Sequence, residues 1–92
     1  MRIFDAFYDH PEIRLITTRH EQTTTYMAYG YARVKGKPGV ALVSPGPAVQ
    51  NASAGLGTAY AASTPVLLLA GQVKSPMIGK DHGVLHEIND QL

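Results

Sequence analysis

The sequence predicts an α/β domain built around a parallel sheet. Short, unbroken apolar stretches alternate with longer stretches of helical character, and turn-forming residues separate them. Unbroken apolar strands are typical of parallel sheets that helices cover on both faces. We therefore expect a three-layer α/β/α arrangement in a single domain over residues 1–92, and a partial one, because only three strands are predicted.

The first third of the chain predicts a short helix, a strand and a long helix. Apolar side chains in residues 3–7 have helical spacing. Residues 13–17 are apolar and partly β-branched, which is typical of a strand. Thr17 and Thr18 then offer an N-cap for a helix over about residues 20–34.

The remainder of the chain repeats the alternation of strand and helix. Residues 40–43 form a short apolar stretch that ends at a Ser-Pro-Gly-Pro turn over 44–47. Small residues dominate the predicted helix over 48–62, which allows close packing. Residues 66–70 read Val-Leu-Leu-Leu-Ala, the most hydrophobic predicted strand, and residues 84–92 indicate the start of another helix.

Composition excludes several classes of function. The chain is 45% hydrophobic and 16% charged, as globular proteins are, and its net charge of +1 does not favour nucleic-acid binding. It contains no cysteine, which excludes disulfides and cysteine-based zinc sites. The longest apolar run is too short to cross a bilayer and the N-terminus lacks the pattern of a signal peptide, so the cytoplasm is the default expectation.

Several motifs follow one another in a definite order. They read Arg-His-Glu-Gln at 19–22, Met-Ala-Tyr-Gly-Tyr-Ala-Arg at 27–33, Ser-Pro-Gly-Pro at 44–47 followed by Asn51, and Gly-Gln-Val at 71–73. Their order and spacing resemble the aminopyrimidine-binding (Pyr) domain of thiamine-diphosphate enzymes of the acetolactate synthase, pyruvate oxidase and benzoylformate decarboxylase type. The resemblance extends over nearly the whole chain, from about residue 5 to residue 92.

This resemblance implies a thiamine-diphosphate-dependent lyase or transferase that acts on a small 2-oxo acid. In such enzymes a carboxylate hydrogen-bonded to the aminopyrimidine ring enables the cofactor to remove its own C2 proton. The resemblance assigns that catalytic, cofactor-binding carboxylate to Glu21. It implies further cofactor-binding positions at Gly46, Pro47 and Asn51, and substrate-proximal positions at Leu85 and His86.

The resemblance also implies a partner. The family's pyrophosphate-binding domain carries a Gly-Asp-Gly segment for magnesium and diphosphate, and no Asp-Gly pair occurs here. We therefore expect that domain, in another chain or in a homo-oligomer, to bind the magnesium. The family's first strand would precede Met1 and its later Pyr strands would follow Leu92, so we expect an incomplete Pyr domain that is inactive alone. Ala48 departs from the family's Gly-Pro-Gly turn and Leu-His-Glu at 85–87 departs from Phe-Gln-Glu, which leaves the substrate open.

Other interpretations stand beside these. An acidic residue such as Glu21 in a first helical turn complements the helix dipole by about 0.3–1 kcal/mol without any catalytic role. The turn at 44–47 is equally well explained as an ordinary strand-to-helix connection with proline at a helix start. His82 and His86 are better explained as surface side chains than as metal ligands. The whole chain is alternatively a non-catalytic truncated product or an interaction fragment. A nucleotide- or flavin-binding module is the third alternative, but the chain has no phosphate-binding fingerprint.

Overall fold

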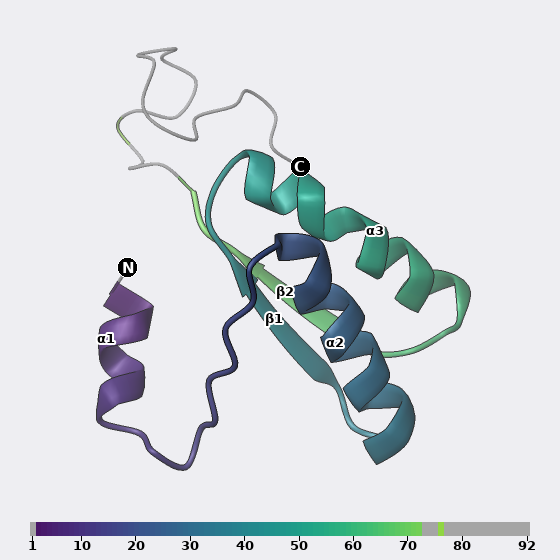
Figure 1. The fold of residues 1–92 in the computed structure, drawn as a ribbon, viewed down its shortest axis with the longest axis horizontal. Coiled ribbons are helices and arrows are strands. Elements are labelled where there is room, and N and C mark those ends of the chain that lie inside the picture. Colours follow the sequence, from purple (N-terminus) through teal and green to yellow (C-terminus); the bar gives the residue numbers. More distant parts are fainter. Residues whose placement is uncertain (1, 73–75, 77–92) are drawn as a thin grey trace.

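The computed structural model describes residues 2–72 and 76, and it contains a βαβ unit with an additional helix packed beside it (Figure 1). The elements in chain order are helix α1 (Arg2–Tyr8), helix α2 (Glu21–Lys35), strand β1 (Gly39–Val43), helix α3 (Pro47–Ala61) and strand β2 (Val66–Ala70). The two strands are parallel, with Val40 opposite Leu67 and Leu42 opposite Leu69. Helix α3 connects them, as a parallel pair of strands requires.

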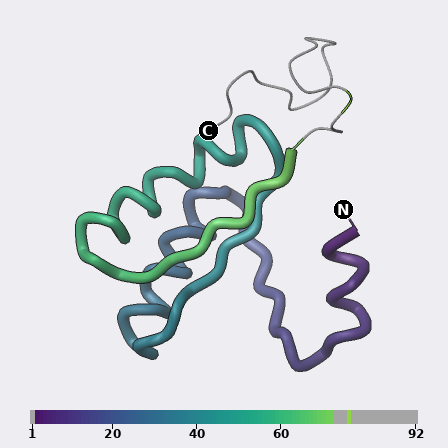
Figure 2. Tube along the Cα trace, turned by 180° about the vertical axis from the view of Figure 1, so that it is seen from behind, coloured from purple at the N-terminus to yellow at the C-terminus, as the bar shows by residue number. Residues whose placement is uncertain are grey.

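Helices α2 and α3 lie side by side on one face of this sheet, as both views of the chain show (Figures 1 and 2). Side chains alternate between the two faces of a strand. Ala41 and Val43 are accordingly buried, each 4% exposed, whereas Val40 is 59% exposed and Leu67 is 53% exposed. The face of the sheet that carries Val40 and Leu67 is therefore open in the part of the chain that the structure describes.

The predicted α/β class and the parallel sheet are confirmed. Within residues 2–72 and 76 the packed part has two layers, the sheet and the α2–α3 pair, and α1 takes no part in the contacts between elements. The observed bounds of the two strands and of the two long helices differ from the predicted ones by one residue at most. The predicted helix over 84–92 lies outside the described residues.

The prediction of a strand over 13–17 was wrong. This stretch has no regular secondary structure, and the sheet in the described part of the chain contains only β1 and β2. Ile13, Leu15 and Ile16 are 50%, 46% and 56% exposed. Because β propensity reflects a fit to a paired, half-buried surface, an apolar and partly β-branched stretch that pairs with no neighbouring strand does not become a strand.

Small side chains allow the long helices and the sheet to approach closely. A β-carbon added at Gly55 of α3 would lie 2.1 Å from Oγ1 of Thr25 on α2, and one added at Gly39 of β1 would lie 2.1 Å from the carbonyl oxygen of Ala28. Both distances are far below van der Waals contact. The two glycines therefore permit backbone approaches that any larger residue would prevent. The core cluster likewise consists of small side chains, which pack against Leu68: Val43, Ala48, Val49 and Ala52.

Glycine also ends helix α2. Gly36 adopts the left-handed conformation with φ 67°, and its N–H donates to the carbonyl of Ala32 at 3.0 Å. This is the usual way in which a helix ends at glycine, because glycine has no β-carbon to oppose a positive φ. None of the described helices is long and apolar enough to cross a membrane.

Candidate functional site

The predicted site residues that the structure describes gather at one edge of the sheet. Both parallel strands end at this edge, and both long helices begin there (Figure 1). The N–H of Gly71, which follows β2, donates to the carbonyl of Val43 at the end of β1, at 3.0 Å. In open α/β sheets ligands bind at the carboxyl ends of the strands, where helix N-termini also point.

Glu21 is the first residue of α2 and is half-buried. The N-cap of this helix is His20, whose Nδ1 accepts from the backbone N–H of Gln22 at 3.0 Å. The prediction of a Thr17 or Thr18 cap was therefore wrong, since the Thr18 hydroxyl instead donates to the His20 carbonyl at 3.1 Å. A histidine ring nitrogen serves as the acceptor here, and the Glu21 carboxylate is placed in the first turn, where the helix dipole stabilises negative charge.

Asn51 provides a contact to Glu21 across the two helices. Its Nδ2 donates to Oε2 of Glu21 at 3.2 Å, although the two residues are separated by 30 positions in the sequence. Asn51 lies about one turn into α3 and Glu21 lies at the start of α2. Two residues that the sequence singled out separately therefore form one hydrogen-bonded pair.

The turn before α3 brings Gly46 and Pro47 to the same edge. Gly46 has φ 73° and ψ −125°, a conformation open essentially to glycine alone, and it is the N-cap of α3. No side chain caps this helix, and Pro47 occupies its first turn, where a missing N–H costs nothing. A β-carbon on Gly71 would lie 3.2 Å from Cδ of Pro45, so the ends of both strands pack together at this turn. Leu85 and His86 lie outside the described residues, as does His82.

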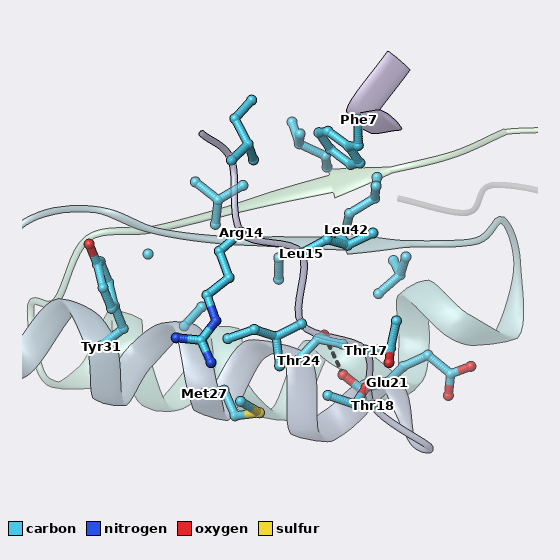
Figure 3. A pocket seen from close by; sticks show the side chains of 18 of the residues that line it. Phe7, Arg14, Leu15, Thr17, Thr18, Glu21, Thr24, Met27, Tyr31 and Leu42 are labelled. Atoms are coloured by element: carbon cyan, nitrogen blue, oxygen red, sulfur yellow. Dashed lines mark hydrogen bonds between the residues drawn. The ribbon is translucent and has the colours of Figure 1, made fainter. Parts of the chain in front are cut away.

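A cavity of about 920 Å³ lies beside this edge and is a separate feature. On one side it is lined by α1 and by residues 12–20, and on the other by β1 and α2. Glu21 contributes to its lining, whereas Gly46, Pro47 and Asn51 do not. Figure 3 shows Glu21 at one end of the cavity, with its carboxylate turned away from Arg14 and Tyr31. The cavity is thus the space between residues 2–20 and the sheet, and the Glu21–Asn51 pair is directed elsewhere.

Sequence comparison decides the family. The sequence model of the family described as "Thiamine pyrophosphate enzyme, N-terminal TPP binding domain" matches residues 1–92. The chain belongs to this thiamine pyrophosphate enzyme family. The predicted family is therefore confirmed.

Relatives in this thiamine pyrophosphate enzyme family are much longer proteins. A probable 2-ketoarginine decarboxylase of Pseudomonas aeruginosa is 51% identical over 79 residues, which are 86% of this chain and 14% of the relative. The acetolactate synthase large subunit of Haemophilus influenzae is 47% identical over 79 residues, with the same 86% and 14% coverage. The large subunit of acetolactate synthase isozyme 3 of Escherichia coli is 44% identical, again with 86% and 14% coverage. The chain thus spans about a seventh of the length of these relatives.

The edge can be tested against the cofactor of the family. Glu21, hydrogen-bonded to Asn51, presents a carboxylate at a helix N-terminus, and a carboxylate is chemically able to share a proton with a nitrogen of an aminopyrimidine ring. The diphosphate end requires a cation and its ligands, and among residues 2–72 and 76 no group of three or more His, Cys, Asp or Glu side chains could hold a metal ion. The described residues of this thiamine pyrophosphate enzyme chain therefore fit the aminopyrimidine end of the cofactor.

The sequence interpretation missed Thr25. Its side chain is 0% exposed, and its Oγ1 donates to the carbonyl of Ala52 at 2.8 Å, from α2 to α3. The spacing of the sequence could have indicated this residue. Thr25 lies one helical turn after Glu21, as Gly55 lies one turn after Asn51, so each lies on the same helix face as a predicted site residue.

Proposed function

We propose that this chain provides the aminopyrimidine side of a thiamine-diphosphate site and that Glu21 is the residue that bonds the ring nitrogen. The observation that supports this most is the position of the Glu21 carboxylate. It lies in the first turn of α2, at the carboxyl edge of a parallel sheet, and is hydrogen-bonded to Asn51 at 3.2 Å. A catalytic carboxylate must be held in a fixed direction to share a proton with a bound ring.

Thiamine diphosphate supplies the nucleophilic carbon that attacks a 2-oxo acid. In this proposal Glu21 holds or accepts the proton at the ring nitrogen, and Asn51 supports the carboxylate that does so. Gly46 has no side chain and a buried backbone, and with Pro47 it leaves room for a flat ring to approach the turn before α3. The first turn of α2 stabilises the negative charge of Glu21 before that proton is transferred.

The finer assignments belong to the same proposal. The names of the relatives, acetolactate synthase and 2-ketoarginine decarboxylase, support a 2-oxo acid substrate. Leu85 and His86 are proposed to lie beside that substrate. We propose that magnesium and the diphosphate are bound by a pyrophosphate-binding domain, in another chain or in another subunit of a homo-oligomer. The 92-residue chain alone is then inactive.

Calorimetry tests this proposal. Thiamine diphosphate and magnesium are titrated into the 92-residue chain alone and then into a mixture with the pyrophosphate-binding domain of an acetolactate synthase. We expect the mixture to give more binding heat than the pyrophosphate-binding domain alone. With the Glu21→Gln variant of this chain, that additional heat should be lost. The matched control is Glu12→Gln, which removes a carboxylate that is exposed and distant in sequence. Turnover of pyruvate by the chain alone, abolished by Glu21→Gln, would contradict the proposed division of the site.

The open face of the sheet supports a second candidate, a non-catalytic interaction fragment. Val40 and Leu67 are opposite each other on the two strands, and both are more than half exposed. Adjacent apolar side chains on an uncovered face are typical of a surface that another protein covers. Light scattering of the chain tests this candidate: association that Val40→Ser abolishes, without any cofactor binding in the calorimetry, would favour it over the catalytic proposal.

A further inference from the structure

We propose that Thr25 and Asn51 together position the Glu21 carboxylate. In this proposal the contact between Thr25 and Gly55 fixes the separation of α2 and α3. This inference rests on the proposed function of Glu21. In it Asn51 contacts the carboxylate directly, and Thr25 acts through α3 and does not touch the cofactor.

The crossing is held by a buried hydrogen bond. Oγ1 of Thr25 lies 2.8 Å from the carbonyl oxygen of Ala52 on α3 and 3.1 Å from that of Gln22 on its own helix. A hydroxyl has a single proton to donate, and the shorter contact is the one between the helices. Since Thr25 is 0% exposed, no water replaces this bond when it is lost.

Gly55 makes the crossing close. A β-carbon at this position would lie 2.1 Å from Oγ1 and 2.5 Å from Cβ of Thr25, and 2.9 Å from its backbone carbonyl carbon. The side chain and backbone of α2 thus pack directly against the backbone of α3. Such a contact has little freedom to slide, because a shift in either direction brings larger residues into the same space.

Glu21 and Asn51 both lie one helical turn from the contact between Thr25 and Gly55. Glu21 lies four residues before Thr25, and Asn51 lies four residues before Gly55. Residues four apart lie on the same face of a helix, one turn from each other. The Thr25–Gly55 contact therefore sets the distance between the helices one turn away, where Asn51 Nδ2 meets Glu21 Oε2 at 3.2 Å.

Because Asn51 is exposed, its hydrogen bond to Glu21 depends on a fixed separation of the two helices. Asn51 lies on the surface, where water competes for its amide. A hydrogen bond of 3.2 Å is near the long end of the useful range, so a small increase in helix separation breaks it. We infer that the bond persists because the backbone of α3 is anchored at the adjacent residue, Ala52.

The test uses nuclear magnetic resonance of the 92-residue chain without cofactor. The side-chain amide signals of Asn51 are compared in the wild type, in Glu21→Ala, which removes the acceptor, and in Thr25→Val, which removes only the buried hydroxyl. We expect Thr25→Val to move these signals at least half of the way to their positions in Glu21→Ala. Thr25→Ser keeps the hydroxyl and should restore the wild-type positions, and Thr23→Val on the exposed side of α2 is the matched control.

Wild-type signals in a folded Thr25→Val chain would overturn the proposal. A second measurement needs no variant at Thr25. In the wild type, the side-chain amide protons of Asn51 should exchange with water about fivefold more slowly than those of the exposed neighbour Gln50, as a single net hydrogen bond predicts. Equal exchange rates would also overturn the proposal.

These results are independent of the proposed function. The amide signals and exchange rates report the Glu21–Asn51 bond in the absence of cofactor. If they agree with the proposal but Glu21→Gln has no effect on cofactor binding or catalysis, then the proposed function fails and the positioning contact survives as a structural one.

Discussion

The chain divides into two regions of different character. Helix α1 contains no buried residue, and residues 9–20 contain none either. All the buried residues of the described chain lie between Thr25 and Ala59, in α2, β1, α3 and the turn that leads into α3. Both regions contain apolar side chains, so hydrophobicity alone does not separate them. The difference is that small residues in the second region let backbones come close, whereas α1 takes no part in the contacts between elements and residues 12–20 border the cavity beside β1.

This difference matters for Glu21, which lies at the boundary between the two regions. Glu21 is the first residue of the packed region, and its carboxylate accepts a hydrogen bond from Asn51 on α3. His20, on the other side of the boundary, caps α2. Changes at the α2–α3 crossing should therefore reach the site, and changes in α1, which takes no part in the contacts between elements, should not.

The largest effect is expected at Gly55. Gly55→Ala forces a methyl group into the crossing at 2.1 Å from Oγ1 of Thr25, and overpacking of this kind costs about 1–3 kcal/mol. Gly57 on the same helix has nothing within 4 Å of an added β-carbon. Gly57→Ala should instead stabilise the chain by about 0.5–1 kcal/mol, because alanine is the better helix former. Urea unfolding of the two variants measures both changes, and equal stabilities would show that the helices do not cross at Gly55.

The next largest effect is expected at Thr25. Thr25→Val removes the buried hydrogen bond from Oγ1 to the carbonyl of Ala52, which costs about 0.5–1.5 kcal/mol, because this carbonyl keeps its backbone hydrogen bond within α3. Thr25→Ser keeps the hydroxyl and loses one methyl group, so it should cost less. The comparison of the two unfolding free energies separates the hydrogen bond from packing. A larger loss for serine than for valine would mean that the methyl group, and not the hydroxyl, holds the crossing.

A small effect is expected in the first region. Ile16 is 56% exposed, and exposed substitutions usually change stability by less than about 0.5 kcal/mol. Ile16→Ser should therefore leave the urea midpoint nearly unchanged, and it should also leave the Asn51 amide signals in place. A loss comparable to that of Thr25→Val would show that residues 13–17 pack on the sheet in solution.

The smallest effect concerns pH. A backbone hydrogen bond, and then the side chain of His10 at 2.9 Å, hold the pKa of Glu12 below its ordinary value of 4.5. A carboxylate whose pKa is lowered by folding contributes stability above its unfolded pKa, and this contribution is lost as the pH falls through the folded pKa. Glu12 is fully exposed, so solvent screens the contact. The wild type and Glu12→Gln should differ slightly at neutral pH and converge below pH 4.5, which unfolding at several pH values measures.

Sequence patterns predicted the packed region and helix α1 well, but they were wrong over residues 13–17. Residues 66–70 were predicted as a strand with the observed bounds, because a short apolar run between a proline and a glycine has few other solutions. Residues 13–17 have comparable β propensity, but a strand also needs a neighbour, which local sequence does not reveal. The family was predictable from the order of the motifs. The Asn51–Glu21 bond was not, since it depends on a helix crossing that Gly55 and Thr25 create across 30 residues.

The most direct test of the central claim, that Glu21 is the proton partner of the cofactor, is catalysis in a chimera. These 92 residues replace the matching segment of the large subunit of acetolactate synthase isozyme 3 of Escherichia coli, and kcat on pyruvate is measured for the chimera and for its Glu21→Gln and Glu12→Gln variants. The account predicts that Glu21→Gln lowers kcat by about 10²-fold or more, as the loss of a positioned proton partner does, while Glu12→Gln leaves it unchanged. An active chimera in which Glu21→Gln turns over pyruvate as fast as the unsubstituted chimera would contradict it.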